Sequence, residues 1–247
     1  MRMKRMRKLR TSNSERETSR ERGRVRTNIE FRAADGLVVT GDLYPRTDAA
    51  GWLVLCHRSH FNRGEYAEIA PRLQATGYAC VAIDQRSGMK VLGFENETYA
   101  RAKKAGLETG YLAARVDVEA AVAEAYRRNG REPVVVVGSS YSASLALMIA
   151  AESTMVRAVA AFSPGEYFKK CRVADVISTI RVPIFATGAR DEIDAIRDLL
   201  RRVPKRLVSI YQPSAEGRHG ARVLWQATAG HDGYWTALLS FLESVRG

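Results

Sequence analysis

The chain has few cysteines and no long apolar run. Its three cysteines, Cys56, Cys80 and Cys171, are an odd number and lack the spacing of a metal site. Cys56 and Cys80 lie in apolar segments, where a free thiol behaves as a small hydrophobic side chain. No segment approaches the roughly 20 apolar residues that cross a bilayer, and there is no glycine-rich phosphate loop. We therefore expect a cytoplasmic protein that uses no metal and no diffusible cofactor.

Positive charge is concentrated at one end of the chain. The formal net charge is +12, and residues 1–26 hold eleven Lys and Arg against three Glu, which leaves the remainder nearly balanced. This arm has too few apolar residues to offset the entropy of ordering, so we expect it to be disordered. It could be an incidental extension, a weak contact for a polyanion or a targeting segment. A nucleic-acid tether would bind less tightly as salt rises and would fail without residues 1–26.

Strands and helices alternate over residues 27–247. Apolar runs predict buried strands, and segments with helical apolar spacing lie between them. Asp35-Gly36 indicates a hairpin, and Pro71 falls inside a predicted helix that it should bend. The runs are WLVLC, YACVAID, PVVVVG, VRAVAAF, VPIFATG and RLVSIY. This alternation predicts one α/β domain with a doubly wound, mainly parallel sheet and helices on both faces. Ligands of such sheets bind beyond the carboxyl ends of the strands.

The sequence VVVVGSSYSASLALM places Ser140 between an apolar strand and an apolar helix. This context is typical of a nucleophile elbow, a strained turn that lifts one serine hydroxyl out of the fold. Small residues flank the serine in such a turn because backbone segments approach closely. Gly138 meets that need on one side, whereas Ser142 stands where glycine is usual on the other. The helix that follows would direct its positive end at the site and favour developing negative charge.

The chain resembles the α/β-hydrolase superfamily, close to its dienelactone-hydrolase-like branch. The resemblance spans about residues 30–247 and rests on the element order, the elbow and its partners. The segment LVLCHRSHFNRGEYAEIAPRLQATGYACVAIDQRSG resembles the family's third strand, oxyanion loop, first helix and fourth strand. The resemblance implies a compact hydrolase in which serine, acid and histidine follow one another along the chain.

Two histidines follow Ser140 and compete for the role of general base. His219 lies in a glycine-flanked loop directly after the last predicted strand, which places it at the same sheet edge as Ser140. It also resembles the family's His-Gly catalytic loop. His231 comes twelve residues later, just before the final helix, where it could simply start that helix. We favour His219.

The acid that orients the histidine should follow the strand VPIFATG. Asp191 stands there in a Gly-x-x-Asp arrangement like that of the family, and we expect it to be the acid. Glu192 and Asp194 could replace it if the loop register differs, although they could also stabilise a helix N-terminus. Asp84, at the end of another strand, is a further candidate, but a structural loop hydrogen bond is the simpler interpretation.

The oxyanion hole requires two backbone N–H groups. We expect one from Tyr141, the residue after the nucleophile, and one from Ser59 in the loop after WLVLC. The family usually has His-Gly at the start of this loop, and Arg58 stands here in place of that glycine. His57 and His60 are expected to be structural.

Loops around the predicted site are short with one exception. Nineteen residues separate the predicted strands at 156–162 and 182–187, too few for the large lid that many lipases and epoxide hydrolases insert there. The exception is segment 86–111, which contains Asn96-Glu97-Thr98 and Gly106. We expect it to be the main loop facing the substrate.

These residues predict a serine hydrolase that cleaves a carboxylic ester or lactone through an acyl-serine intermediate. The expected partner is a small-molecule ester or lactone, with no metal and no membrane span. Because fold alone does not prove chemistry, a non-catalytic binding protein on the same fold stays an alternative. A peptidase or a thioesterase that uses the same triad also stays open. The order of Ser140, Asp191 and His219 at strand ends favours the esterase hypothesis.

Overall fold

A computed structural model of the protein describes residues 26–246. Within this range the strands form one eight-stranded sheet in the order β1-β2-β4-β3-β5-β6-β7-β8. The strands are β1 (Thr27–Arg32), β2 (Val38–Tyr44), β3 (Trp52–Cys56), β4 (Ala79–Ile83), β5 (Val134–Ser139), β6 (Val156–Phe162), β7 (Ile184–Thr187) and β8 (Val208–Ile210). β2 pairs antiparallel with β1 and with β4, and every other pairing is parallel. The predicted fold class is confirmed.

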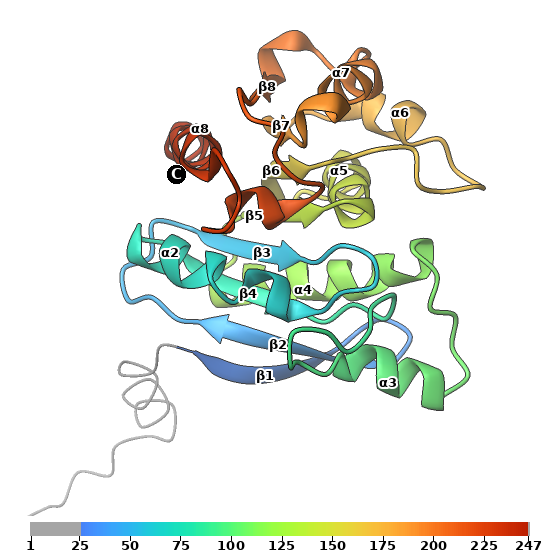
Figure 1. Ribbon diagram of the computed structural model, residues 1–247. Coiled ribbons are helices and arrows are strands. Elements are labelled where there is room, and N and C mark those ends of the chain that lie inside the picture. The colour runs from blue at the N-terminus through green and yellow to red at the C-terminus, as the bar shows by residue number, and fades with distance from the viewer. Residues whose placement is uncertain (1–25, 247) are drawn as a thin grey trace, which may run out of the picture.

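Helices cover both faces of the sheet (Figure 1). They are α2 (Ile69–Ala75), α3 (Glu97–Lys104), α4 (Arg115–Arg128), α5 (Tyr141–Glu152), α6 (Val173–Val176), α7 (Ile193–Leu200) and α8 (His231–Ser244). Apolar side chains of α4, α5, α6 and α7 form one buried cluster with one face of the sheet. Those of α2 and α8 form a second cluster on the opposite face. Among the described helices, none combines the length and apolar character needed to cross a membrane.

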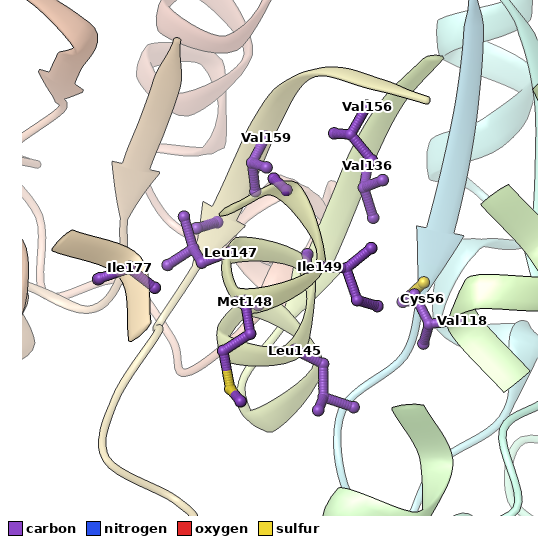
Figure 2. Close-up of a cluster of buried hydrophobic side chains, with 14 of the residues drawn as sticks. Cys56, Val118, Val136, Leu145, Leu147, Met148, Ile149, Val156, Val159 and Ile177 are labelled. Atoms are coloured by element: carbon purple, nitrogen blue, oxygen red, sulfur yellow. The ribbon is translucent and has the colours of Figure 1, made fainter. Parts of the chain in front are cut away.

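The helix α5 lies at the centre of the larger cluster. Its residues from Tyr141 to Ala150 are all buried, as suits a helix whose sequence is apolar nearly all round. Figure 2 shows Leu145, Leu147, Met148 and Ile149 directed outward from this helix toward the surrounding strands and helices. Because packing surrounds α5, the turn that precedes it is held in a fixed position at the carboxyl edge of the sheet.

Two local predictions differ from the structure. Pro71 lies in the first turn of α2 and not in the helix interior, so its missing N–H removes no helical hydrogen bond. Segment 86–111 contains helix α3, and Asn96 caps that helix by accepting a hydrogen bond from Tyr99 N. Thr98 is buried and its Oγ accepts from Thr40 N. This part of the segment therefore packs into the fold.

Loop lengths near the site agree with the sequence. Between β6 and β7 lie only the four-residue helix α6 and a short 3₁₀ turn, Ile177–Thr179. The predicted arm, residues 1–26, lies outside the described residues except for Arg26, whose guanidinium is 3.3 Å from a carboxylate oxygen of Asp42.

Candidate active site

A strained turn presents Ser140 at the carboxyl end of β5. Its φ of 60° and ψ of −127° lie outside the regions that residues with a side chain ordinarily adopt. Strain of this kind persists only where surrounding structure enforces it. Here Ser140 N donates to Phe162 O at 2.7 Å, which binds the turn to β6. Gly138 is required because a Cβ there would lie 2.5 Å from Ala143 Cα and from Ser142 O.

Ser142 stands where the elbow usually has a second glycine, and its hydroxyl contacts two backbone carbonyl groups. Its hydroxyl donates to His57 O and lies 3.1 Å from Ser139 O. The first contact joins the start of α5 to the loop after β3. The side chain thus connects two segments that both contribute to the site.

His219 connects the elbow to an acidic side chain. Its Nε2 lies 2.7 Å from Ser140 Oγ, and its Nδ1 lies 2.5 Å from Glu192 Oε1. A carboxylate can only accept, so Nδ1 carries the proton and Nε2 accepts from the Ser140 hydroxyl. The His219 side chain keeps 32% of its surface exposed, which leaves the imidazole accessible from solvent.

The acid beside His219 is Glu192 and not Asp191. Asp191 is exposed, as is Asp194, which pairs with Arg197 at 2.8 Å. The reason for the difference is local: Arg190–Glu192 is a 3₁₀ turn, in which neighbouring side chains point about 120° apart. The turn directs residue 192 inward and residue 191 outward, and the longer glutamate reaches the imidazole.

Glu192 is held by several donors. Its Oε2 accepts from Ser163 Oγ at 2.6 Å and from Ala189 N at 2.8 Å. Burial alone would raise the pKa of Glu192, but the hydrogen bonds from His219, Ser163 and Ala189 outweigh it and lower the pKa. The carboxylate is thus kept ionised next to the imidazole.

The other sequence candidates lie elsewhere. His231 begins α8, with its Nδ1 3.4 Å from Asp232 Oδ1. Asp84 is buried and accepts from Arg63 N and Glu97 N, as a structural loop residue would. His60 is exposed.

The backbone N–H groups expected from sequence to form an oxyanion hole belong to Tyr141 and Ser59. Among the described residues, Tyr141 N and Ser59 N have no hydrogen-bond partner, whereas Arg58 N donates to Glu65 Oε2 at 2.7 Å. His57 is fully buried behind this loop, where Gln85 N donates to its Nε2 at 2.9 Å. The loop therefore has a fixed backbone despite the arginine at its second position.

Three side chains near the site were missed by the sequence analysis. Ser163 follows β6, donates to Glu192 and accepts from Gly220 N at 2.8 Å, next to His219. The hydroxyl of Tyr167 donates to Ser163 O at 2.8 Å, and burial raises its pKa. Glu65 is buried below the elbow. Only Ser163 carried a signal, since it directly follows a parallel strand at the functional edge.

Two arginines flank the site. The guanidinium of Arg58 lies 5.8 Å from the centre of the Phe61 ring. The guanidinium of Arg222 lies 5.8 Å from the centre of the Trp225 ring. The two rings are 6.2 Å apart. Burial lowers the pKa of Arg222, and the nearby charge of Arg58 lowers it further. Within residues 26–246, no group of three or more His, Cys, Asp or Glu is arranged to hold a metal ion.

Comparison with solved structures shows that the fold is widely shared. An esterase of Pyrococcus furiosus superposes with a TM-score of 0.71 at 17% identity, over 90% of this chain and 93% of that one. A dienelactone hydrolase from Anabaena variabilis gives 0.64 at 16% identity, over 88% and 96%. The acylaminoacyl peptidase of Pyrococcus horikoshii gives 0.61 at 14%, over 90% of this chain but 41% of that chain. Identities this low establish the fold alone.

Sequence comparison identifies the family. Comparison with curated proteins finds no significant match. The model of the alpha/beta hydrolase family, however, matches residues 47–246, which include the elbow and both of its partners. The recognition of this superfamily from sequence is thus confirmed. The chain belongs to the α/β-hydrolase family.

Proposed function

We propose that the protein is a serine hydrolase that cleaves carboxylic esters or lactones through an acyl-serine intermediate. Ser140 is the nucleophile, His219 the general base and Glu192 the acid, in place of the Asp191 expected from sequence. The observation that carries the proposal is the continuous hydrogen-bonded path from Ser140 Oγ through both nitrogens of His219 to Glu192. A structural histidine has no need of a strained serine at one nitrogen and a carboxylate at the other.

The geometry supports a two-step reaction. Ser140 Oγ attacks the carbonyl carbon while its proton passes to His219 Nε2, and Glu192 stabilises the resulting imidazolium. Tyr141 N and Ser59 N donate to the carbonyl oxygen as it becomes negative. Collapse of the tetrahedral intermediate breaks the ester C–O bond, and His219 returns the proton to the leaving alkoxide. Water, deprotonated by His219, then hydrolyses the acyl-serine and restores the free enzyme.

Labelling with a fluorophosphonate tests the nucleophile. The reagent should modify one residue, and mass spectrometry should locate it at Ser140. Ser140→Ala should abolish labelling and lower hydrolysis of a short p-nitrophenyl ester by at least about 10³-fold. Ser178→Ala is the matched control, because Ser178 donates only to the nearby Asp175 O. Unchanged turnover in Ser140→Ala would disprove the proposal.

A substrate panel tests the reaction class. An acyl thioester and a peptide p-nitroanilide, assayed beside the p-nitrophenyl ester, distinguish esterase from thioesterase and peptidase. We expect the ester to give the highest kcat/KM. Labelling of Ser140 together with faster cleavage of the anilide would retain the triad and assign a peptidase.

A further inference from the structure

A carboxyl group without a catalytic role lies directly beneath the elbow. Glu65 belongs to the 3₁₀ turn Arg63–Tyr66, and its side chain is fully buried. Among the described residues, no Lys, Arg or His lies within ion-pair distance of it, unlike the buried Asp84 and Asp117, which pair with Arg63 and Arg86. A buried carboxyl is costly to desolvate, so its polar contacts must account for its place.

Both hydrogen-bond partners of the Glu65 side chain stand next to residues of the proposed site. Oε2 accepts from Arg58 N at 2.7 Å, and Arg58 precedes Ser59. Oε1 accepts from Ser139 Oγ at 2.8 Å, and Ser139 precedes the nucleophile. Ser139 Oγ in turn accepts from Ala221 N at 2.8 Å, two residues beyond His219. One carboxyl group thus joins the oxyanion loop, the elbow and the histidine loop.

The loop that holds His219 packs closely against Ser139. Gly220, between His219 and Ala221, has a φ of +78°, and a Cβ there would lie 2.4 Å from Ser139 Oγ. A side chain at position 220 would separate the loop from Ser139. The backbone of Glu65 adds a further tie, since Trp225 Nε1 donates to Glu65 O at 2.9 Å.

The direction of these hydrogen bonds favours a carboxylate over an amide. Arg58 N can only donate, and the Ser139 hydroxyl donates to Oε1 while its oxygen accepts from Ala221 N. Both oxygens of Glu65 therefore act as acceptors, whereas glutamine would direct an NH₂ group at one of these partners. Burial raises the pKa of Glu65, and the donors Arg58 N and Ser139 Oγ oppose that rise.

We propose that Glu65 is a positioning residue that fixes the oxyanion donor Ser59, the nucleophile Ser140 and the base His219 relative to one another. The inference rests on the proposed hydrolase function. Displacing a reacting group by about 1 Å can cost on the order of 10²-fold in rate. Because Glu65 acts on geometry and does not touch the substrate, its loss lowers kcat more than it raises KM.

The test compares Glu65→Gln with Glu68→Gln, a nearby glutamate that is exposed. We expect Glu65→Gln to lower kcat for the p-nitrophenyl ester by about 10- to 100-fold, with KM changed by less than about threefold, while Glu68→Gln matches wild type. Circular dichroism and thermal unfolding identify the folded fraction, so that kcat is expressed per folded molecule. A Glu65→Gln protein with lower Tm but wild-type kcat would show a purely structural residue and overturn the proposal.

Ser139→Ala and the double variant test the connection itself. If both residues act through one path, the double variant loses no more kcat than the more affected single variant. Losses that multiply would refute the shared path. The result is separable from the proposed function: if wild type shows Ser140-dependent hydrolysis and Glu65→Gln retains kcat, only the role of Glu65 fails. If Ser140→Ala keeps full turnover, the hydrolase proposal itself fails.

Discussion

Two imidazoles at the same edge of the sheet have opposite surroundings. His57 follows β3 and is fully buried, with backbone partners on both nitrogens: Nδ1 lies 2.7 Å from Arg58 O, and Gln85 N donates to Nε2. His219 follows β8 and is partly exposed, with the side chains of Ser140 and Glu192 on its nitrogens. Both rings have the same tautomer, since Nδ1 donates in each.

The two rings differ in whether their hydrogen-bond partners permit the ring to gain a proton. The amide of Gln85 cannot give up its proton or accept another, so a proton added to His57 Nε2 would face an N–H donor without compensation. Burial lowers the pKa of His57 to about 4, and the hydrogen bond to Arg58 O only partly offsets this. In the proposed reaction, the hydroxyl of Ser140 transfers its proton to His219, and Glu192 stabilises the product cation. Similar positions on the sheet thus give a structural ring and a reactive one.

The largest effect is expected from removing the reactive ring. His219→Ala should lower kcat for the p-nitrophenyl ester by at least about 10³-fold, because no other group described near Ser140 can accept its proton. The measurement is steady-state hydrolysis at constant pH. His231→Ala, twelve residues along the chain, is the matched control and should retain wild-type turnover. Equal losses in the two variants would contradict the assignment of the base.

The next effect concerns the acid. Glu192→Gln keeps the shape of the side chain but removes the charge that stabilises the imidazolium, and an amide can also select the wrong tautomer. We expect kcat to fall about 10²- to 10⁴-fold, whereas Asp191→Asn should have almost no effect because Asp191 is exposed. Hydrolysis assays of both variants decide between the adjacent carboxylates. A larger loss in Asp191→Asn would restore the assignment made from sequence.

The structural ring should affect stability through pH. Burial lowers the pKa of His57 in the folded protein to about 4, below the ordinary imidazole value of 6.5. Between pH 4 and pH 6.5 the unfolded chain therefore binds more protons at His57 than the folded chain does. The free energy of unfolding falls as the pH decreases from 6.5 toward 4, and the contribution of His57 no longer changes below pH 4. The loss amounts to about 3 kcal/mol in the free energy of unfolding. Urea unfolding at a series of pH values measures it.

His57→Gln provides the comparison for this measurement. The variant has no titrating group at position 57, so its stability should depend less on pH over the same interval, even though its stability at pH 7.5 is lower. The quantity compared is the difference in slope between wild type and variant, which removes the contribution of other titrating groups. Equal slopes would mean that His57 does not lose its charge on folding.

The sequence was sufficient for the fold and for the position of Ser140 at the elbow, but not for the carboxylate that contacts His219. Continuous apolar runs marked the parallel strands because both faces of the sheet are covered, and Ser140 stood out because it follows such a strand. The choice between Asp191 and Glu192 depends on the phase of a single 3₁₀ turn, which apolar periodicity does not report. Glu65 was missed for a similar reason: its partners Arg58, Ser139 and Ala221 are distant in sequence and carry no shared pattern.

The smallest effect is expected at Ser142, which lies between the loop of His57 and the elbow that contacts His219. Its hydroxyl donates to the carbonyl of His57, so it joins the start of α5 to the loop of the structural ring. Ser142→Ala removes that hydrogen bond and should lower the free energy of unfolding by about 1 kcal/mol. Ser142→Gly restores the residue usual in the family but adds backbone freedom in the first turn of α5, for a total loss of about 1–2 kcal/mol. The strained turn depends on Gly138 and on packing around α5, not on this hydroxyl, so kcat should stay within about threefold of wild type in both variants. Both variants are measured for kcat and for unfolding. A tenfold loss of kcat in both would show instead that the Ser142 hydroxyl positions the oxyanion loop, so that the surroundings of His57 also affect the reaction.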